Sequence, residues 1–314
     1  MAPITLEQAK LNTQDAINLN VIDEFRTNPI MDAMVFDQVV NPAGGGATLT
    51  YGYTRLATTR GAEFRAINSE YTPEAVTRKR FTVDLKVLGG SFEIDRVLAN
   101  LGPAATSEVT LQMSQVIKAT TAKFGDSVIN GDSTKGNGFD GLTKALKGSK
   151  TENTTAFDWS GPINQAKAFE ILTNVDDLLS TIDGQATLLL GNRRTIQLIK
   201  AASRYANQYV EKVGPRDTTL ATYAGATLVD AGQGAGSTAD VIPVTEGVSA
   251  LYAVRIGLDG FHAVTTTGTP LVRTWMPDFS TAGAVKTGEV EMSPVAVALK
   301  ATKAAGVLTH IKVA

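Results

Sequence analysis

The chain has 314 residues, of which 43% are hydrophobic and 19% charged, as is usual for a globular protein with a sizeable core. Lys and Arg (29) nearly balance Asp and Glu (31), which argues against a protein whose binding depends on neutralising phosphates. The absence of cysteine excludes disulfides, thiolate metal sites and cysteine nucleophiles. We also expect no membrane partner, because no apolar run approaches the roughly 20 residues of a membrane helix and the N-terminus lacks a signal-peptide pattern.

The N-terminal part of the sequence is weakly amphipathic. Residues 5–26 follow a loose helical pattern, which predicts an arm that precedes the compact part of the chain. Residues 41–46 (Asn-Pro-Ala-Gly-Gly-Gly) then interrupt any regular structure.

A long β-hairpin is the most distinctive predicted element. Residues 48–56 are rich in strand formers, and residues 78–88 alternate strictly between apolar and polar side chains. The apolar face carries Phe81, Val83, Leu85 and Val87. Gly89-Gly90 predicts a bulge or bend, after which Phe92 and Ile94 continue the alternation.

Such a hairpin needs a surface to lie on. Residues 78–95 would span about 55–60 Å when extended, whereas an isolated two-stranded hairpin is marginally stable in water. We expect a neighbouring subunit to supply this surface.

Helices and short strands follow, which gives an α+β fold class. The first helix is predicted over residues 107–130, with Thr106 or Ser107 as its cap and Gly131 at its end. The second is predicted from Pro162 to about Gly184. The remaining expected elements are a buried strand at 186–191, a helix from 192 or 193 to about 202, strands at 227–229, 250–256 and 261–266, and a strand-like tail at 284–313.

No residue pattern supports catalysis or a cofactor. Residues 136–141 (Gly-Asn-Gly-Phe-Asp-Gly) match the dinucleotide fingerprint, but a predicted helix precedes them where the motif requires a strand, so a tight loop is the better interpretation. His262 and His310 have no second ligand at metal spacing. The carboxylate pairs Asp176-Asp177 and Glu289/Glu291 have no histidine or glycine-rich cradle beside them. We therefore expect no enzyme, no metal and no cofactor.

The order of elements resembles the major capsid proteins of tailed bacteriophages, which share the Hong Kong 97-type fold. The local likenesses are residues 136–142 (Gly-Asn-Gly-Phe-Asp-Gly-Leu), 188–194 (Leu-Leu-Leu-Gly-Asn-Arg-Arg) and 249–260 (Ser-Ala-Leu-Tyr-Ala-Val-Arg-Ile-Gly-Leu-Asp-Gly). This resemblance implies a division of the chain into the parts of that fold. They are an N-terminal arm (1–41), an extended hairpin loop (42–91), a peripheral domain built on a long spine helix (92–185 and 276–314) and an axial domain (186–275).

The resemblance also implies a function. The chain is expected to form hexamers and pentamers of an icosahedral shell that encloses the phage genome. The virion would be its final location, after assembly in the host cytoplasm. Expected partners are further copies of the chain, a separate scaffolding protein, a portal, in some cases a cement protein, and double-stranded DNA contacted without sequence specificity. Two alternatives stay open: an encapsulin, which shares the fold and forms a cellular nanocompartment, and a nucleotide-dependent enzyme.

A group of basic residues on the hairpin provides the candidate site. If the hairpin lies on a neighbour, these residues would oppose acidic groups there and set the register of the contact. Otherwise they are an ordinary solvated face. The residues are Arg55, Arg60, Arg65, Arg78, Lys79 and Arg80.

Overall fold

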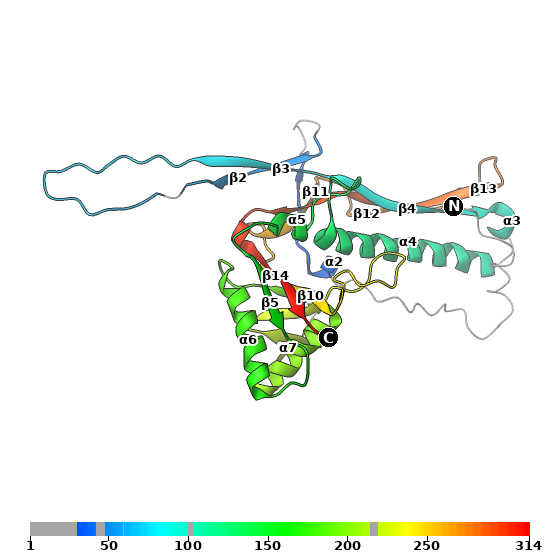
Figure 1. Ribbon diagram of the computed structural model, residues 1–314. Helices are drawn as coiled ribbons and strands as arrows, with labels where there is room; N and C mark the ends of the chain where they lie inside the picture. Colours follow the sequence, from blue (N-terminus) through cyan, green and yellow to red (C-terminus); the bar gives the residue numbers. More distant parts are fainter. Residues whose placement is uncertain (1–29, 42–47, 59, 100–102, 214–218) are drawn as a thin grey trace.

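The computed structural model describes residues 30–41, 48–58, 60–99, 103–213 and 219–314, with side chains in the long helix from residue 108 onward. A hairpin projects from a body made of two sheets, each with its own helices (Figure 1). The helices are α2 (Ile30–Ala33), α3 (Arg96–Ala99), α4 (Pro103–Asn130), α5 (Leu142–Leu146), α6 (Gln165–Ser180), α7 (Arg193–Tyr205) and the 3-10 turn η2 (Thr302–Ala304). Residues 1–29 of the predicted arm lie outside the described residues, as does most of the break at 41–46.

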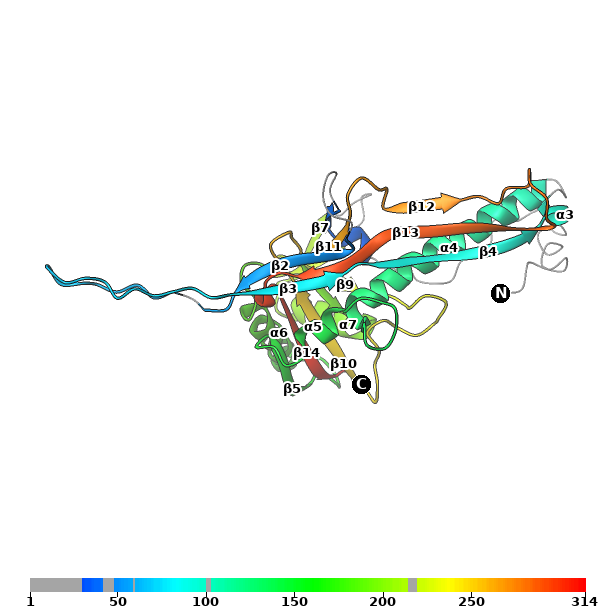
Figure 2. The same cartoon turned by 90° about the horizontal axis from the view of Figure 1, so that it is seen from above.

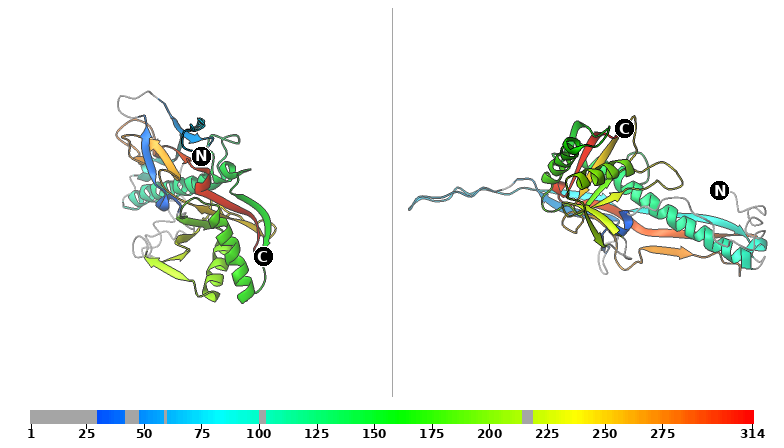
Figure 3. Two further views of the ribbon diagram at one scale, coloured as in Figure 1. Left: turned by 90° about the vertical axis from the view of Figure 1, so that its left-hand side faces the viewer. Right: turned by 90° about the horizontal axis from the view of Figure 1, so that it is seen from below.

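The first sheet has five strands and is built around one long strand, β13 (Val285–Leu299). β13 lies between β12 (Val272–Trp275) and β4 (Lys86–Asp95), and its C-terminal end pairs with β11 (Phe261–Thr266). β1 (Phe36–Val40) adds to β11 in parallel. The long helix α4 runs along one face of β4 and β13, as Figure 3 shows from below.

α4 begins earlier than the sequence pattern suggests. It starts at Pro103, so the prediction that Thr106 or Ser107 caps the helix is wrong: both lie inside it. Proline suits a first helical turn because its fixed φ is helical and its missing N–H has no partner there. Apolar side chains of α4 form one stripe toward the core: Val109, Met113, Phe124 and Val128 are buried with Thr120, and Val116 is half-buried. At about 1.5 Å per residue, its 28 residues span about 42 Å.

α4 ends at Asn130 as predicted, but the following glycine is required by close packing. A Cβ on Gly131 would lie 2.3 Å from the carbonyl oxygen of Phe139 and 2.4 Å from that of Ser127. The returning loop hydrogen-bonds here, with the Gly141 N–H donating to the Gly131 carbonyl at 2.8 Å.

The predicted bend at Gly89-Gly90 is wrong. β4 continues through both glycines, and the chain instead breaks at Leu85, between β3 (Arg78–Asp84) and β4. A Cβ on Gly89 would lie 2.4 Å from the Val290 carbonyl oxygen, and one on Gly90 would lie 3.1 Å from Val116 of α4, so these glycines permit close packing. The break also reverses the alternation, which leaves Val87 60% exposed instead of buried.

The second sheet has seven strands in the order β5-β14-β10-β6-β9-β8-β7. α6 and α7 pack against one of its faces (Figures 1 and 3). The predicted buried strand is β6, all four residues of which are buried. The strands are β5 (Glu152–Asp158), β6 (Leu188–Gly191), β7 (Val210–Val213), β8 (Thr219–Tyr223), β9 (Ala226–Asp230), β10 (Val248–Val254) and β14 (Ala305–Lys312).

The helices on this sheet start at asparagine caps. The Asn192 side chain accepts a hydrogen bond from the Arg194 N–H, so α7 begins where predicted. α6 begins at Gln165 with Asn164 as its cap, because the Asn164 side chain accepts a hydrogen bond from the Lys167 N–H. The predicted start at Pro162 is therefore too early. The helix also ends at Ser180, four residues before the predicted Gly184.

Candidate assembly surface

The hairpin is the element that the body supports least. β2 (Thr50–Leu56) pairs with β3 in register from Thr50↔Asp84 to Leu56↔Arg78, and the connecting residues, described over 57–58 and 60–77, extend well beyond the body (Figures 1 and 2). Phe64 is fully exposed and Ile67 is 91% exposed, and Leu56, Tyr71 and Val76 are exposed as well. Large apolar side chains held in water are typical of a surface that another protein covers.

The distal part of the hairpin still has an ordered conformation. The Gly61 N–H donates to the Glu74 carboxylate at 3.0 Å, and the Thr72 N–H donates to that of Glu63 at 3.2 Å. Nearer the body, the Thr77 N–H donates to the Thr58 hydroxyl at 2.9 Å. Side chains thus join the two arms where no strand ladder forms.

The root of the hairpin is fixed to the body by Arg55. Its guanidinium donates to the carbonyl oxygens of Lys300, at 2.8 Å, and Leu299. The guanidinium carbon also lies 4.3 Å from the centre of the Phe81 ring and 5.4 Å from that of Tyr53. The Tyr53 hydroxyl donates to the Leu299 carbonyl at 3.0 Å, so two adjacent side chains hold the same corner.

A buried histidine lies beneath the same root. His262 on β11 is fully buried, meets the Tyr51 ring edge-on with centroids 6.1 Å apart, and has its Nε2 3.8 Å from the Asp37 carboxylate. Burial, reinforced by the nearby charge of Lys300, lowers the pKa of His262 below its ordinary value. His262 is therefore a packed residue of the interior. His310 is exposed and contacts the neighbouring Thr309 hydroxyl.

The six basic hairpin residues do not form one cluster. Arg55 is half-buried and its guanidinium is hydrogen-bonded within its own chain. Arg65 folds back onto the turn, donating to the Ser69 carbonyl at 3.1 Å. The cross-strand pairing places Lys79 on the same face as Arg55, and Arg78 and Arg80 on the opposite face. Arg60 and these last three are exposed, and their contact with a neighbour stays a prediction.

The loop with the dinucleotide fingerprint is a structural turn. It joins α4 to the five-residue α5, so no strand precedes it and no long helix follows. Phe139 is buried, and Lys144 lies 2.7 Å from Asp132 and 2.8 Å from Asp140. Hydrogen bonds from Lys144 and Thr134 hold the pKa of Asp132 far below its usual range. The loop interpretation is confirmed.

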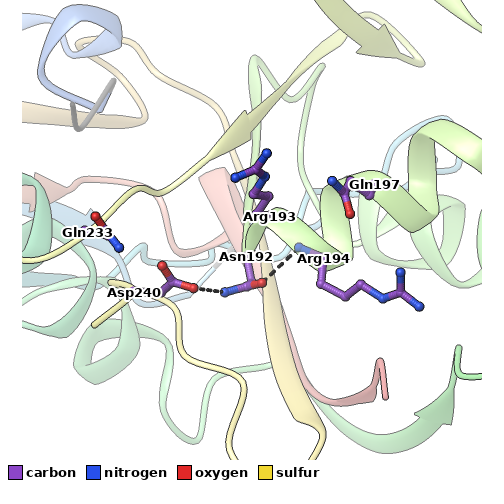
Figure 4. A pocket seen from close by; sticks show the side chains of 6 residues that line it. All are labelled: Asn192, Arg193, Arg194, Gln197, Gln233 and Asp240. Carbon is purple, nitrogen blue, oxygen red and sulfur yellow. Dashed lines mark hydrogen bonds between the residues drawn. The ribbon is translucent and has the colours of Figure 1, made fainter. Parts of the chain in front are cut away.

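The pocket at the start of α7 offers no phosphate site either. It is lined by Asn192, Arg193, Arg194, Gln197, Gln233 and Asp240 (Figure 4). The Asn192 side-chain amide donates to the Asp240 carboxylate at 2.8 Å. The Asn192 side-chain oxygen accepts a hydrogen bond from the Arg194 N–H, which is therefore not free to bind an anion. The negatively charged Asp240 carboxylate in the pocket would repel a bound anion. The arginine side chains, moreover, point in different directions in Figure 4.

Two other classes of site find no support in the described residues. They contain no group of three or more His, Cys, Asp or Glu side chains that could hold a metal ion. No helix among them is long and apolar enough to cross a membrane.

Comparison with solved structures identifies the architecture. The holo-SrpI encapsulin complex from Synechococcus elongatus PCC 7942 matches 100% of this chain and 97% of its own, with a TM-score of 0.67 and 12% identity. The chain has the Hong Kong 97-type capsid fold. The capsid of a native GTA particle matches with a TM-score of 0.63 and 11% identity over 95% of this chain and 94% of its own. The capsid of Myoviridae phage XM1 matches with a TM-score of 0.58 and 11% identity over 98% and 99%.

Sequence comparison adds no relative. No family model matches the chain, and no curated protein matches it. At identities this low, the Hong Kong 97-type fold is what the likeness establishes, and function is a separate question.

Proposed function

We propose that the chain is a structural shell subunit, and specifically the major capsid protein of a tailed bacteriophage. The observation that carries the proposal is the hairpin, whose residues 57–77 expose large apolar side chains beyond the body of a capsid fold. In an isolated monomer these apolar side chains stay in contact with water and contribute no stability. A neighbouring copy that covers Phe64, Ile67 and Tyr71 removes their apolar surface from water, which contributes about 25 cal/mol per Å².

Under this proposal the chain divides as its fold family does. Residues 42–91 are the extended loop, 92–185 and 276–314 the peripheral domain, 186–275 the axial domain, and 1–41 the arm. Copies of the chain form hexamers and pentamers of an icosahedral shell. A scaffolding protein and a portal direct its assembly in the host cytoplasm, a cement protein is added afterwards in some shells of this kind, and the packaged double-stranded DNA is contacted without sequence specificity.

Electron microscopy tests the proposal. The chain is expressed alone and together with the products of the genes that surround it, and the particles are imaged. Closed icosahedral shells are expected. A well-ordered monomer in every one of these preparations would contradict the proposal.

A second candidate is the shell of an encapsulin. It is favoured by the full-length likeness to the holo-SrpI encapsulin complex. The same experiment separates the two candidates: an encapsulin shell assembles from the chain alone, whereas a phage capsid requires its scaffolding protein for shells of uniform size.

A further inference from the structure

The sequence contains two Asn-Gly pairs, Asn130-Gly131 and Asn137-Gly138. Asparagine is a thermally labile residue, and it is most labile before glycine, which has no Cβ to obstruct the approach of its backbone nitrogen to the preceding side chain. Both pairs lie in the described part of the chain, one at the end of α4 and the other in the loop between α4 and α5. Their surroundings differ in the features that decide whether this chemistry can occur.

The chemistry is an intramolecular attack followed by hydrolysis. The glycine backbone nitrogen loses its proton and bonds to the Cγ of the asparagine, while the bond from Cγ to the amide nitrogen breaks and that nitrogen leaves as ammonia. Water then opens the cyclic imide at one of its two carbonyls, which gives either aspartate or isoaspartate. Water is the only other reactant, and nothing is oxidised or reduced. The reaction requires a glycine N–H without a strong partner and an asparagine side chain that is free to turn onto it.

The pair at the end of α4 meets neither requirement. The Asn130 side-chain nitrogen donates to the Asp126 carboxylate at 2.9 Å and to the Val241 carbonyl at 2.7 Å. The Gly131 N–H donates to the Ser127 carbonyl at 3.0 Å. Ring formation at Asn130 would break all of these hydrogen bonds, so the folded structure protects this asparagine.

The pair in the loop meets both requirements. Residues 133–138 are all exposed, and neither the Asn137 side chain nor the Gly138 N–H has a hydrogen-bond partner among the residues that the structure describes. A Cβ added to Gly136 or to Gly138 would meet nothing within 4 Å, so the Asn137 side chain has room to turn onto the Gly138 nitrogen.

The base of this loop is fixed even though its tip is free. The Ser133 N–H donates to the Asp140 carboxylate at 2.7 Å, and the Lys144 ammonium lies 2.7 Å from Asp132 and 2.8 Å from Asp140. Phe139 is buried directly after the labile pair. Exposed loop tips tolerate changes in the main chain, so an altered linkage at the tip stays between fixed ends.

We propose that Asn137 is a site of spontaneous modification, at which the folded protein is converted to aspartate and isoaspartate while Asn130 remains asparagine. Each conversion adds a negative charge to the loop between α4 and α5. Copies of the chain therefore come to differ in charge as a preparation ages. This modification does not depend on the proposed shell function.

Peptide mapping of aged protein tests the proposal. The folded, unassembled protein is incubated at mildly alkaline pH, where more of the backbone nitrogens lose their proton, and asparagine, aspartate and isoaspartate peptides are separated and identified by mass spectrometry. Asn137 should convert about tenfold or more faster than Asn130, because the ring at Asn130 forms only after its hydrogen bonds are lost. In guanidinium chloride the two pairs should convert at similar rates, because the unfolded chain keeps none of these hydrogen bonds.

Two variants complete the test. Gly138→Ala adds a Cβ that obstructs the attack and should slow conversion of Asn137 severalfold without changing thermal unfolding, since that Cβ meets nothing within 4 Å. Asn137→Gln would need a larger ring, so its charge should stay uniform on ion exchange as the protein ages. Equal rates at Asn130 and Asn137 in the folded protein would overturn the proposal. So would an Asn137 that converts in guanidinium chloride and persists in the folded protein, or a Gly138→Ala protein that converts as fast as the wild type.

Discussion

The guanidinium of Arg55 donates a hydrogen bond to the carbonyl oxygen of Lys300 over 2.8 Å, joining the hairpin to the corner at which β13 ends. Immediately after this corner the chain passes through η2 into β14, and so from the five-stranded sheet into the seven-stranded one. One side chain thus connects the hairpin to the junction of both sheets. The direction of the hairpin is set by this joint.

Replacing Arg55 should loosen that joint. Arg55→Ala removes part-buried hydrogen bonds from a charged donor to two carbonyls and the cation–π contact with Phe81, so the free energy of unfolding should fall by about 2–3 kcal/mol. Denaturant unfolding of the unassembled protein measures the change. Arg78→Ala is the control, because Arg78 is exposed and should change the same quantity by less than about 0.5 kcal/mol. Equal effects of the two substitutions would argue against the Arg55 joint.

The sequence predicted the elements well and the details of their packing poorly. Alternation over residues 78–88 and the apolar stripe of α4 are local patterns, and both indicated the right element. The break at Leu85 depends on how β13 and α4 pack against β4, which alternation alone does not encode. Five strands of the described residues, β1, β5, β7, β8 and β12, were not predicted. β5, for example, carries polar residues such as Asn153 and Thr154, which are common in loops.

Close packing at the end of α4 predicts a large effect from one methyl group. Gly131→Ala would place a Cβ against two carbonyl oxygens and should reduce the free energy of unfolding by about 3 kcal/mol. Gly138→Ala in the same loop is the matched control, since nothing lies within 4 Å of its added Cβ, and it should change stability by less than about 0.5 kcal/mol. Thermal unfolding of both variants provides the comparison. A Gly131→Ala protein as stable as the control would refute this packing.

The buried histidine predicts a pH dependence of stability. The folded-state pKa of His262 lies below its unfolded value of about 6.5, so below that pH the unfolded chain binds a proton that the folded chain does not. Stability should therefore fall as the pH drops below about 6.5. Asp37, Lys300, Tyr51 and Asp259 are the ionisable groups around the ring. Asp132 and Asp140 have lowered pKa values, so their contributions are lost at more acid pH, below about 3.9.

His262→Phe separates this effect from general acid instability. The substitution keeps an aromatic ring against Tyr51 and removes the titrating group, so the decline between pH 7 and pH 5 should become smaller. Denaturation midpoints across this range provide the measurement. His310→Gln removes an exposed histidine and should leave the decline as it is. An unchanged decline in the His262→Phe protein would assign the pH dependence to other groups.

The sequence predicted which residues belong to the candidate site but not how they are arranged. The basic residues of the hairpin stand out in the chain, but which face each one occupies depends on strand pairing and on what the root contacts. Arg55 lies in the same sequence pattern as Arg78 and yet is bound to a corner 245 residues away. Glu93 and Glu289 lie on the same face of the five-stranded sheet only because β4 pairs with β13, which no local pattern indicates.

Shortening the hairpin tests the central claim most directly. Leu56 and Arg78 are a cross-strand pair, so residues 57–77 can be replaced by Asn-Gly, the two-residue turn that best suits an antiparallel hairpin. The shortened chain keeps its body and its Arg55 joint. Sedimentation velocity of both proteins, each with its assembly partners, should show fast-sedimenting shells for the full-length chain and only small, folded species for the shortened one. Shells of normal size from the shortened chain would contradict the claim that the hairpin joins neighbouring subunits.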